Sequence, residues 1–253
     1  MTELMQSIDE SYRAVSALTS KGDYKIYYSH IHPFPILVLG LNPGGAKDGA
    51  SFVASESFFE NWEHDYPRFR NTASYALAGP ICHLLEAVLA TKAVDALRQV
   101  PATNVIFRRS QNIGALSVSQ MAAATEAKAS LARIVEAVNP RVILFISKTA
   151  YDLFVRIHCM KGTTTEDASS RVLTPNGVNS ACIFLRAQGV VNTLSRSVDF
   201  LTIGHPSKYA GRSEWPSVTS ALRSALEELG VSPIERTGAL VPILPLPEYV
   251  PST

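Results

Sequence analysis

Four short apolar runs, separated by segments with helical spacing of apolar side chains, constrain the fold of this chain more than any other feature. The runs are Pro35–Leu41, Ala102–Phe107, Arg141–Ser147 and Val198–Gly204. The first and third are almost unbroken in apolar residues, a pattern typical of strands covered on both faces. Strands of this kind that alternate with helices predict an α/β fold, namely a three-layer α/β/α sandwich around a central, mostly parallel four-stranded sheet.

The segments between the runs predict the helices and loops. Helices are expected at Thr2–Leu18, Ser51–Trp62, Ala73–Leu97, Val118–Val138, Lys148–His158 and Ser217–Leu229. Met160–Ser180, rich in Gly, Thr and Ser, predicts a loop, and Ala181–Leu185 with Val190–Leu194 predict an antiparallel hairpin. We expect a single domain over residues 1–230 and a proline-rich tail over residues 231–253.

Composition excludes several classes of protein. The net charge of the 253 residues is +1, so any site for a polyanion must be a local patch. Three cysteines cannot build a four-cysteine iron–sulfur cluster, and no zinc spacing is present, so we expect no cofactor and no metal. The N-terminus lacks the apolar core of a signal peptide, and no apolar run is long enough to cross a bilayer. These features predict a cytoplasmic protein without membrane contact, and we expect it to be a monomer.

Polar clusters follow three of the predicted strands. They are Asn42-Pro-Gly-Gly, the segment from Arg108 to Asn112, and His205-Pro-Ser207. In open α/β sheets ligands bind at the carboxyl ends of the strands, so the three clusters together predict a site. Each one alone also has a structural explanation: a turn, arginines solvated at the rim, or a hydrogen-bonded histidine at a strand end.

The three clusters, taken in order, resemble motifs of the uracil-DNA glycosylase superfamily. The resemblance covers Pro35 to Leu229. "GLNPG" looks like the mismatch-specific and single-strand-selective branches, and "TNVIFRR" looks like the thermostable branches, whose iron–sulfur cluster this chain cannot build. "HPS" is shared by several branches, and "FISKTAYDLF" is similar to the segment between the second and third motifs. The resemblance implies a uracil-DNA glycosylase-like fold and a DNA partner.

The resemblance also implies roles for individual residues. Asn42 matches the asparagine that positions the attacking water, and His205 matches the histidine that stabilises the departing pyrimidine anion. Asn104 matches the asparagine that reads the Watson–Crick edge of the base. Apart from the resemblance, the forked guanidinium of Arg108 or Arg109 could grip a base edge or a phosphate, and Arg109 is the one expected at the base. Phe52 stands at a spacing like that of the aromatic residue on which a flipped base stacks, although it equally fits a helix-packing residue. Because no lysine in these motifs can form a Schiff base, the resemblance implies a monofunctional enzyme that leaves an abasic site.

Gly44 indicates the range of bases. The strictly uracil-specific branch has a tyrosine at this position that presses against C5 of the ring, whereas this chain has only a hydrogen. The resemblance therefore implies a site open at C5. The candidate substrates are uracil, thymine, and C5-modified pyrimidines such as the hydroxymethylated or glucosylated cytosines of phage DNA, which would give the protein an anti-phage role.

The residues after the histidine are expected to contact DNA. By resemblance they form the loop that fills the space left by a flipped nucleotide, with Tyr209 as the wedge, Ser207 on a phosphate, and Lys208 and Arg212 on flanking phosphates. A basic solvated loop is an equally good explanation of each side chain taken singly. Two other functions remain open: a catalytically silent module that binds damaged or modified bases, and a hydrolase of free nucleosides.

Overall fold

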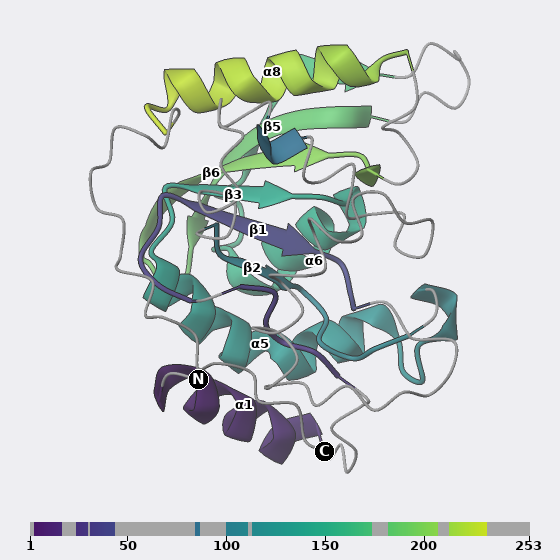
Figure 1. Cartoon of the computed structure of the whole chain (residues 1–253), viewed down its shortest axis with the longest axis vertical. Coiled ribbons are helices and arrows are strands. Elements are labelled where there is room, and N and C mark those ends of the chain that lie inside the picture. Colours follow the sequence, from purple (N-terminus) through teal and green to yellow (C-terminus); the bar gives the residue numbers. More distant parts are fainter. Residues whose placement is uncertain are drawn as a thin grey trace, which may run out of the picture.

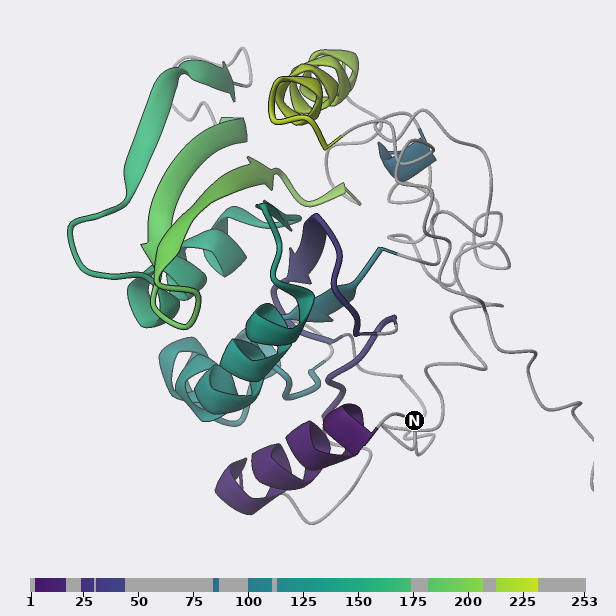
Figure 2. The ribbon, with the colours of Figure 1, turned by 90° about the vertical axis from the view of Figure 1, so that its left-hand side faces the viewer.

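The computed structural model describes residues 3–16, 24–29, 31–43, 84–86, 100–110, 113–173, 182–206 and 213–231. These residues form a central sheet with helices on both of its faces (Figure 1). Helix α8 covers one face, α5 and α6 cover the other, and α1 lies on the outer side of α5 (Figure 2). The predicted α/β sandwich is confirmed.

The predicted helices in the described ranges are confirmed, with small shifts at their ends. In chain order the elements are α1 (Glu3–Ser16), β1 (Ile36–Gly40), β2 (Ala102–Asn104), the short 3-10 helix η2 (Ile113–Ala115), α5 (Gln120–Val138), β3 (Val142–Phe145), α6 (Lys148–His158), β4 (Thr165–Leu173), β5 (Cys182–Val191), β6 (Arg196–Ile203) and α8 (Trp215–Glu228). The helix expected at Ser51–Trp62 lies outside the described residues. Of the one expected at Ala73–Leu97, the structure describes Leu84–Glu86, which are helical.

Within the described ranges the sheet has six strands in the order β2-β1-β3-β6-β5-β4, so the predicted number of four strands was too small. The strands β2, β1, β3 and β6 are mutually parallel, and β5 and β4 extend the sheet in antiparallel fashion. Strand β4 occupies part of the segment that was predicted to be a loop. The polar side chains within Thr165–Ser169 are exposed and give this part of the strand the composition of a loop, because an edge strand buries little of its surface.

The predicted hairpin within residues 181–194 is wrong. This segment contains one continuous strand, β5, and the hairpin forms instead between β5 and β6. The stretch from Arg186 to Gly189, which separates the two predicted strands, lies inside β5 and pairs with β6. A glycine is needed at position 189 because a Cβ atom there would lie 2.8 Å from the Phe200 ring. Gly189 therefore marks a close approach within the strand and not a turn.

The described residues form two apolar core clusters, one on each face of the sheet. The larger cluster lies under α1, α5 and α6 and includes Tyr12, Phe145 and Phe154. The smaller lies under α8 and includes Leu144 and Val231, the first residue of the predicted tail. None of the helices in the described ranges is long and apolar enough to cross a bilayer.

Candidate functional site

The carboxyl ends of the four parallel strands meet at one edge of the sheet. Leu39 of β1, Phe145 of β3 and Thr202 of β6 lie in one row across the sheet. Asn42 and His205 each follow this row by three residues, so they leave the sheet at the same level on either side of β3. Since neighbouring strands are about 4.8 Å apart, the axes of β1 and β6 are roughly 10 Å apart. A spacing of that order fits a planar ring with a hydrogen-bonding group on each side.

Asn104 lies at the same edge, at the end of β2, which pairs with β1 on the side away from β3. It was expected near the start of a longer strand, but β2 pairs with β1 only as far as Asn104, which stands opposite Gly40. The side chain is 6% exposed, and its Nδ2 atom has no hydrogen-bond partner among the described residues. A buried amide donor left without an acceptor costs about 1–3 kcal/mol. The edge of the sheet therefore holds a donor whose acceptor is not among the described residues.

Gly40 makes room for this asparagine. A Cβ atom at Gly40 would lie 2.2 Å from Oδ1 of Asn104, much closer than such atoms can approach. The first glycine of "GLNPG" is thus needed because the Asn104 amide lies over its α-carbon. Sequence reasoning did not assign this role to Gly40, although a glycine inside an apolar strand is a known signal of close approach.

The amide of Asn42 is held in one orientation. Its Nδ2 donates to Oγ of Ser110 at 2.9 Å and to the carbonyl oxygen of Pro43 at 3.0 Å. A carbonyl oxygen can only accept, so the amide nitrogen must face Pro43. Both amide hydrogens are then used inside the protein, and Oδ1 is the atom of Asn42 that can accept a hydrogen bond from a water molecule. Ser110 was not singled out from the sequence, although it lies within the polar cluster after the second strand.

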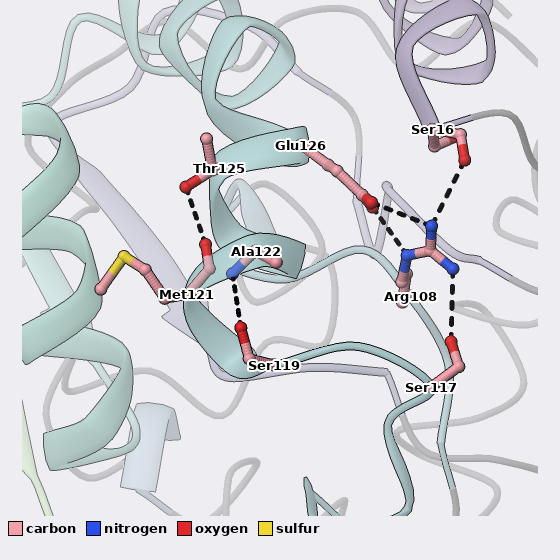
Figure 3. A network of polar contacts seen from close by, with 8 residues as sticks. All are labelled: Ser16, Arg108, Ser117, Ser119, Met121, Ala122, Thr125 and Glu126. Carbon is pink, nitrogen blue, oxygen red and sulfur yellow. Dashed lines mark hydrogen bonds and ion pairs between the residues drawn. The ribbon is translucent and has the colours of Figure 1, made fainter.

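Arg108, the first arginine of "TNVIFRR", forms a structural ion pair. Its Nε and Nη2 donate to the two carboxylate oxygens of Glu126 on α5 at 2.6 and 2.9 Å, as Figure 3 shows. It also donates to the backbone oxygen of Ser16 at 3.3 Å and to Oγ of Ser117 at 3.4 Å. The two functions weighed for it, a solvated rim charge and a contact to base or phosphate, both disagree with this geometry. The role expected of Arg109, which is half-buried, remains a prediction.

His205 follows β6, whose last four residues are buried between β3 and β5. The side chain is half-buried. Its place at the edge is therefore set by a strand with neighbours on both sides. The remaining residues expected at the site lie outside the described residues: Gly44, Phe52, Ser207, Lys208, Tyr209 and Arg212. Their roles remain predictions.

A second histidine, His158, is buried away from this edge. It ends α6, a helix that starts beside the site and runs about 16 Å from it at 1.5 Å per residue. Its ring stacks on Phe154 with the centroids 4.8 Å apart, and its Nε2 has no partner among the described residues. Burial, helped by the charge of Lys128, lowers the pKa of His158 to about 4. His158 is therefore a neutral core residue and lies outside the candidate site.

Comparison with known proteins identifies the family. The sequence model described as "Uracil DNA glycosylase superfamily" matches residues 30–229. That range contains every element from β1 to α8 and all three strand-end motifs. No curated protein matches the chain. The family model covers most of the chain, and the parallel strands bring its motifs to one edge of the sheet, so the chain belongs to the uracil DNA glycosylase superfamily.

Proposed function

We propose that this protein is a monofunctional DNA glycosylase, which turns a pyrimidine nucleotide out of DNA and hydrolyses its N-glycosidic bond to leave an abasic site. Membership of the superfamily supports the reaction class. The observation that carries the proposal is the edge of the sheet where Asn42 and His205 follow parallel strands and Asn104 ends a third. There the buried Nδ2 of Asn104 has no acceptor within the part of the chain that the structure describes. A planar base supplies that acceptor.

The available groups favour a dissociative reaction. Oδ1 of Asn42 can accept a hydrogen bond from a water molecule, but an amide cannot remove a proton as a strong base does. The bond between base and sugar must therefore break early, and water then captures the sugar cation. The pyrimidine leaves as an anion, which a donor at His205 stabilises. A preorganised donor of this kind lowers a barrier by about 3 kcal/mol, a factor of roughly one hundred in rate.

The base is a pyrimidine whose edge can accept from Asn104. The Nδ2 donor pairs with O4 of a uracil-type base or with N3 of a cytosine. Gly44, which carries no side chain, supports a site that is open beside C5. We propose uracil or a C5-substituted pyrimidine as substrate, including the hydroxymethylated or glucosylated cytosines of phage DNA. Action on the modified cytosines would make the protein an anti-phage factor.

A panel of labelled oligonucleotides tests this proposal. Each contains uracil, a thymine mismatch or one C5-modified cytosine, and each is treated with alkali after incubation with the protein. We expect strand breaks at one class of base. Intact strands with tight binding to one oligonucleotide would indicate a binding module, and cleavage confined to free nucleosides would indicate a nucleoside hydrolase.

Two substitutions test the assigned groups. Asn42→Ala and His205→Ala should each lower the rate of excision by about one hundred-fold, with less than a threefold change in affinity for DNA. Asn192→Ala provides a matched control, because Asn192 is exposed in the turn between β5 and β6 at the opposite edge of the sheet. A wild-type rate in either test variant would remove that residue from the mechanism.

A further inference from the structure

We infer that Ser110 is a positioning residue that fixes the amide of Asn42 in the orientation that catalysis needs. The inference rests on the proposed function and concerns the same site. Ser110 follows Asn42 by 68 residues, yet its Oγ accepts a hydrogen bond from Nδ2 of Asn42 at 2.9 Å. Its backbone N–H donates to the carbonyl oxygen of Pro43 at 3.3 Å, and that oxygen also accepts from Nδ2 of Asn42 at 3.0 Å. The three bonds form a closed ring.

This ring of hydrogen bonds favours one of the two orientations of the Asn42 amide, which differ by an exchange of Oδ1 and Nδ2. Rotation of the amide by half a turn would place Oδ1 against the Pro43 carbonyl oxygen, which brings two acceptors together. The Pro43 oxygen therefore selects the orientation. Ser110 holds it, since its N–H directs the Pro43 carbonyl and its Oγ takes the second amide hydrogen. The side chain of Ser110 thus affects the reaction through Asn42 without touching the substrate.

Ser110 can do this because its own position is well supported. It is 8% exposed, and the residues before it are tied to other parts of the molecule. The carbonyl oxygen of Phe107 accepts from the backbone N–H of Lys25 at 2.8 Å, and Arg108 forms its two-bond ion pair with Glu126. The segment after β2 is therefore a firm support for a side chain at the end of β1.

The orientation of the amide decides what the bound water can do. A water that donates to Oδ1 keeps its lone pairs free, and one of them can point at the sugar carbon. A water that instead accepts from Nδ2 uses a lone pair in that bond, so it is a poorer nucleophile. Loss of the Ser110 hydroxyl should therefore reduce the rate of the chemical step, with little effect on binding of DNA.

Kinetics of three variants test the inference. Ser110→Ala should lower kcat about tenfold with KM unchanged within a factor of two, and Ser110→Thr, which keeps the hydroxyl, should recover most of the rate. In the double variant Asn42→Ala/Ser110→Ala the rate should equal that of Asn42→Ala alone, because Ser110 acts only through Asn42. Ser130→Ala, which removes a buried hydroxyl on α5 far from the edge, is the control and should keep the wild-type kcat. Losses that multiply in the double variant would overturn the inference.

A second measurement does not depend on activity. In a 15N-labelled protein, the side-chain NH2 signals of Asn42 are assigned by their absence in Asn42→Ala. We expect slow hydrogen exchange of these protons in the wild type and at least tenfold faster exchange in Ser110→Ala. If Ser110→Ala does not fold, Ser110→Cys, which is of similar size and a weaker acceptor, should show intermediate exchange. Equal exchange in wild type and variant would refute the role of Ser110, whereas an inactive wild type with slow exchange would refute only the glycosylase proposal.

Discussion

Single side chains at the edge of the sheet are positioned by contacts between residues that are distant in sequence. The Asn104 amide lies over Gly40, and the Asn42 amide is held by Ser110. Among the described residues, Nδ2 of Asn104 has no acceptor, and the hydrogen bonds of Nδ2 of Asn42 turn its Oδ1 away from Pro43. Neighbouring parallel strands thus bring groups of opposite hydrogen-bonding character to one edge, as recognition of a base and activation of water together require.

Gly40→Ala tests the contact between β1 and β2. The added methyl group would collide with Oδ1 of Asn104, so we expect excision to fall at least tenfold and the free energy of unfolding to fall by about 1–3 kcal/mol. In an Asn104→Ala background, Gly40→Ala should lower the free energy of unfolding only slightly. The next side chain that the added Cβ would meet is Ile146, whose Cδ1 lies at an ordinary contact distance of 3.6 Å. Denaturant unfolding of the wild type, Gly40→Ala, Asn104→Ala and the double variant measures these free energies. An equal cost in both backgrounds would contradict the assigned clash.

At the scale of elements, the Arg108–Glu126 pair joins the segment after β2 to α5. The two side chains are 15% and 22% exposed, so the pair is largely shielded from water. Arg108 also reaches the last residue of α1 through the backbone oxygen of Ser16. This arginine therefore connects both α1 and α5 to the segment that carries Ser110, and its charge is already balanced inside the protein.

Arg108→Met distinguishes this structural role from DNA contact. Because the change leaves the Glu126 carboxylate unpaired, we expect the free energy of unfolding to fall by about 3 kcal/mol. The double variant Arg108→Met/Glu126→Met should lose less stability, because neither charge remains. The slope of log Kd for DNA against log salt should stay that of the wild type, since no phosphate contact is removed. A shallower slope with unchanged stability would show that Arg108 contacts DNA instead.

At the scale of the whole molecule, a neutral histidine that acid should charge packs against Phe154 of the larger core cluster. His158 is 4% exposed, with a pKa of about 4 in the folded protein against about 6.5 in an unfolded chain. Below pH 6.5 the unfolded chain binds a proton that the folded protein does not. Stability should therefore fall as the pH drops from 6.5 towards 4.

Urea unfolding at pH 7 and pH 4.5 measures this effect. We expect protonation of His158 to lower the free energy of unfolding by roughly 2 kcal/mol between these pH values, so that of His158→Leu should fall by that much less than that of the wild type. The comparison between the two proteins removes the effect of the carboxylates, which titrate in both. Equal losses in wild type and variant would mean that His158 already has a proton or a partner in the folded state.

The parallel strands and the helices of the described ranges were predictable from the sequence because apolar periodicity is a local property. The run from Arg141 to Ser147 needs no partner to be recognised, and α6 begins and ends at the predicted residues. Strand β4 was missed because an edge strand with polar, exposed side chains has the composition of a loop. The polar clusters were visible as well, since they directly follow three apolar runs.

What the sequence by itself determined is therefore the class of fold and the presence of motifs at the ends of its strands. The tertiary structure alone decided which atoms face one another: Asn104 over Gly40, Ser110 on Asn42, and Arg108 on Glu126. The physical reason is that secondary structure follows from the spacing of side chains over a few residues. The orientation of a polar group depends instead on partners that only the paired strands and packed helices bring within hydrogen-bonding distance.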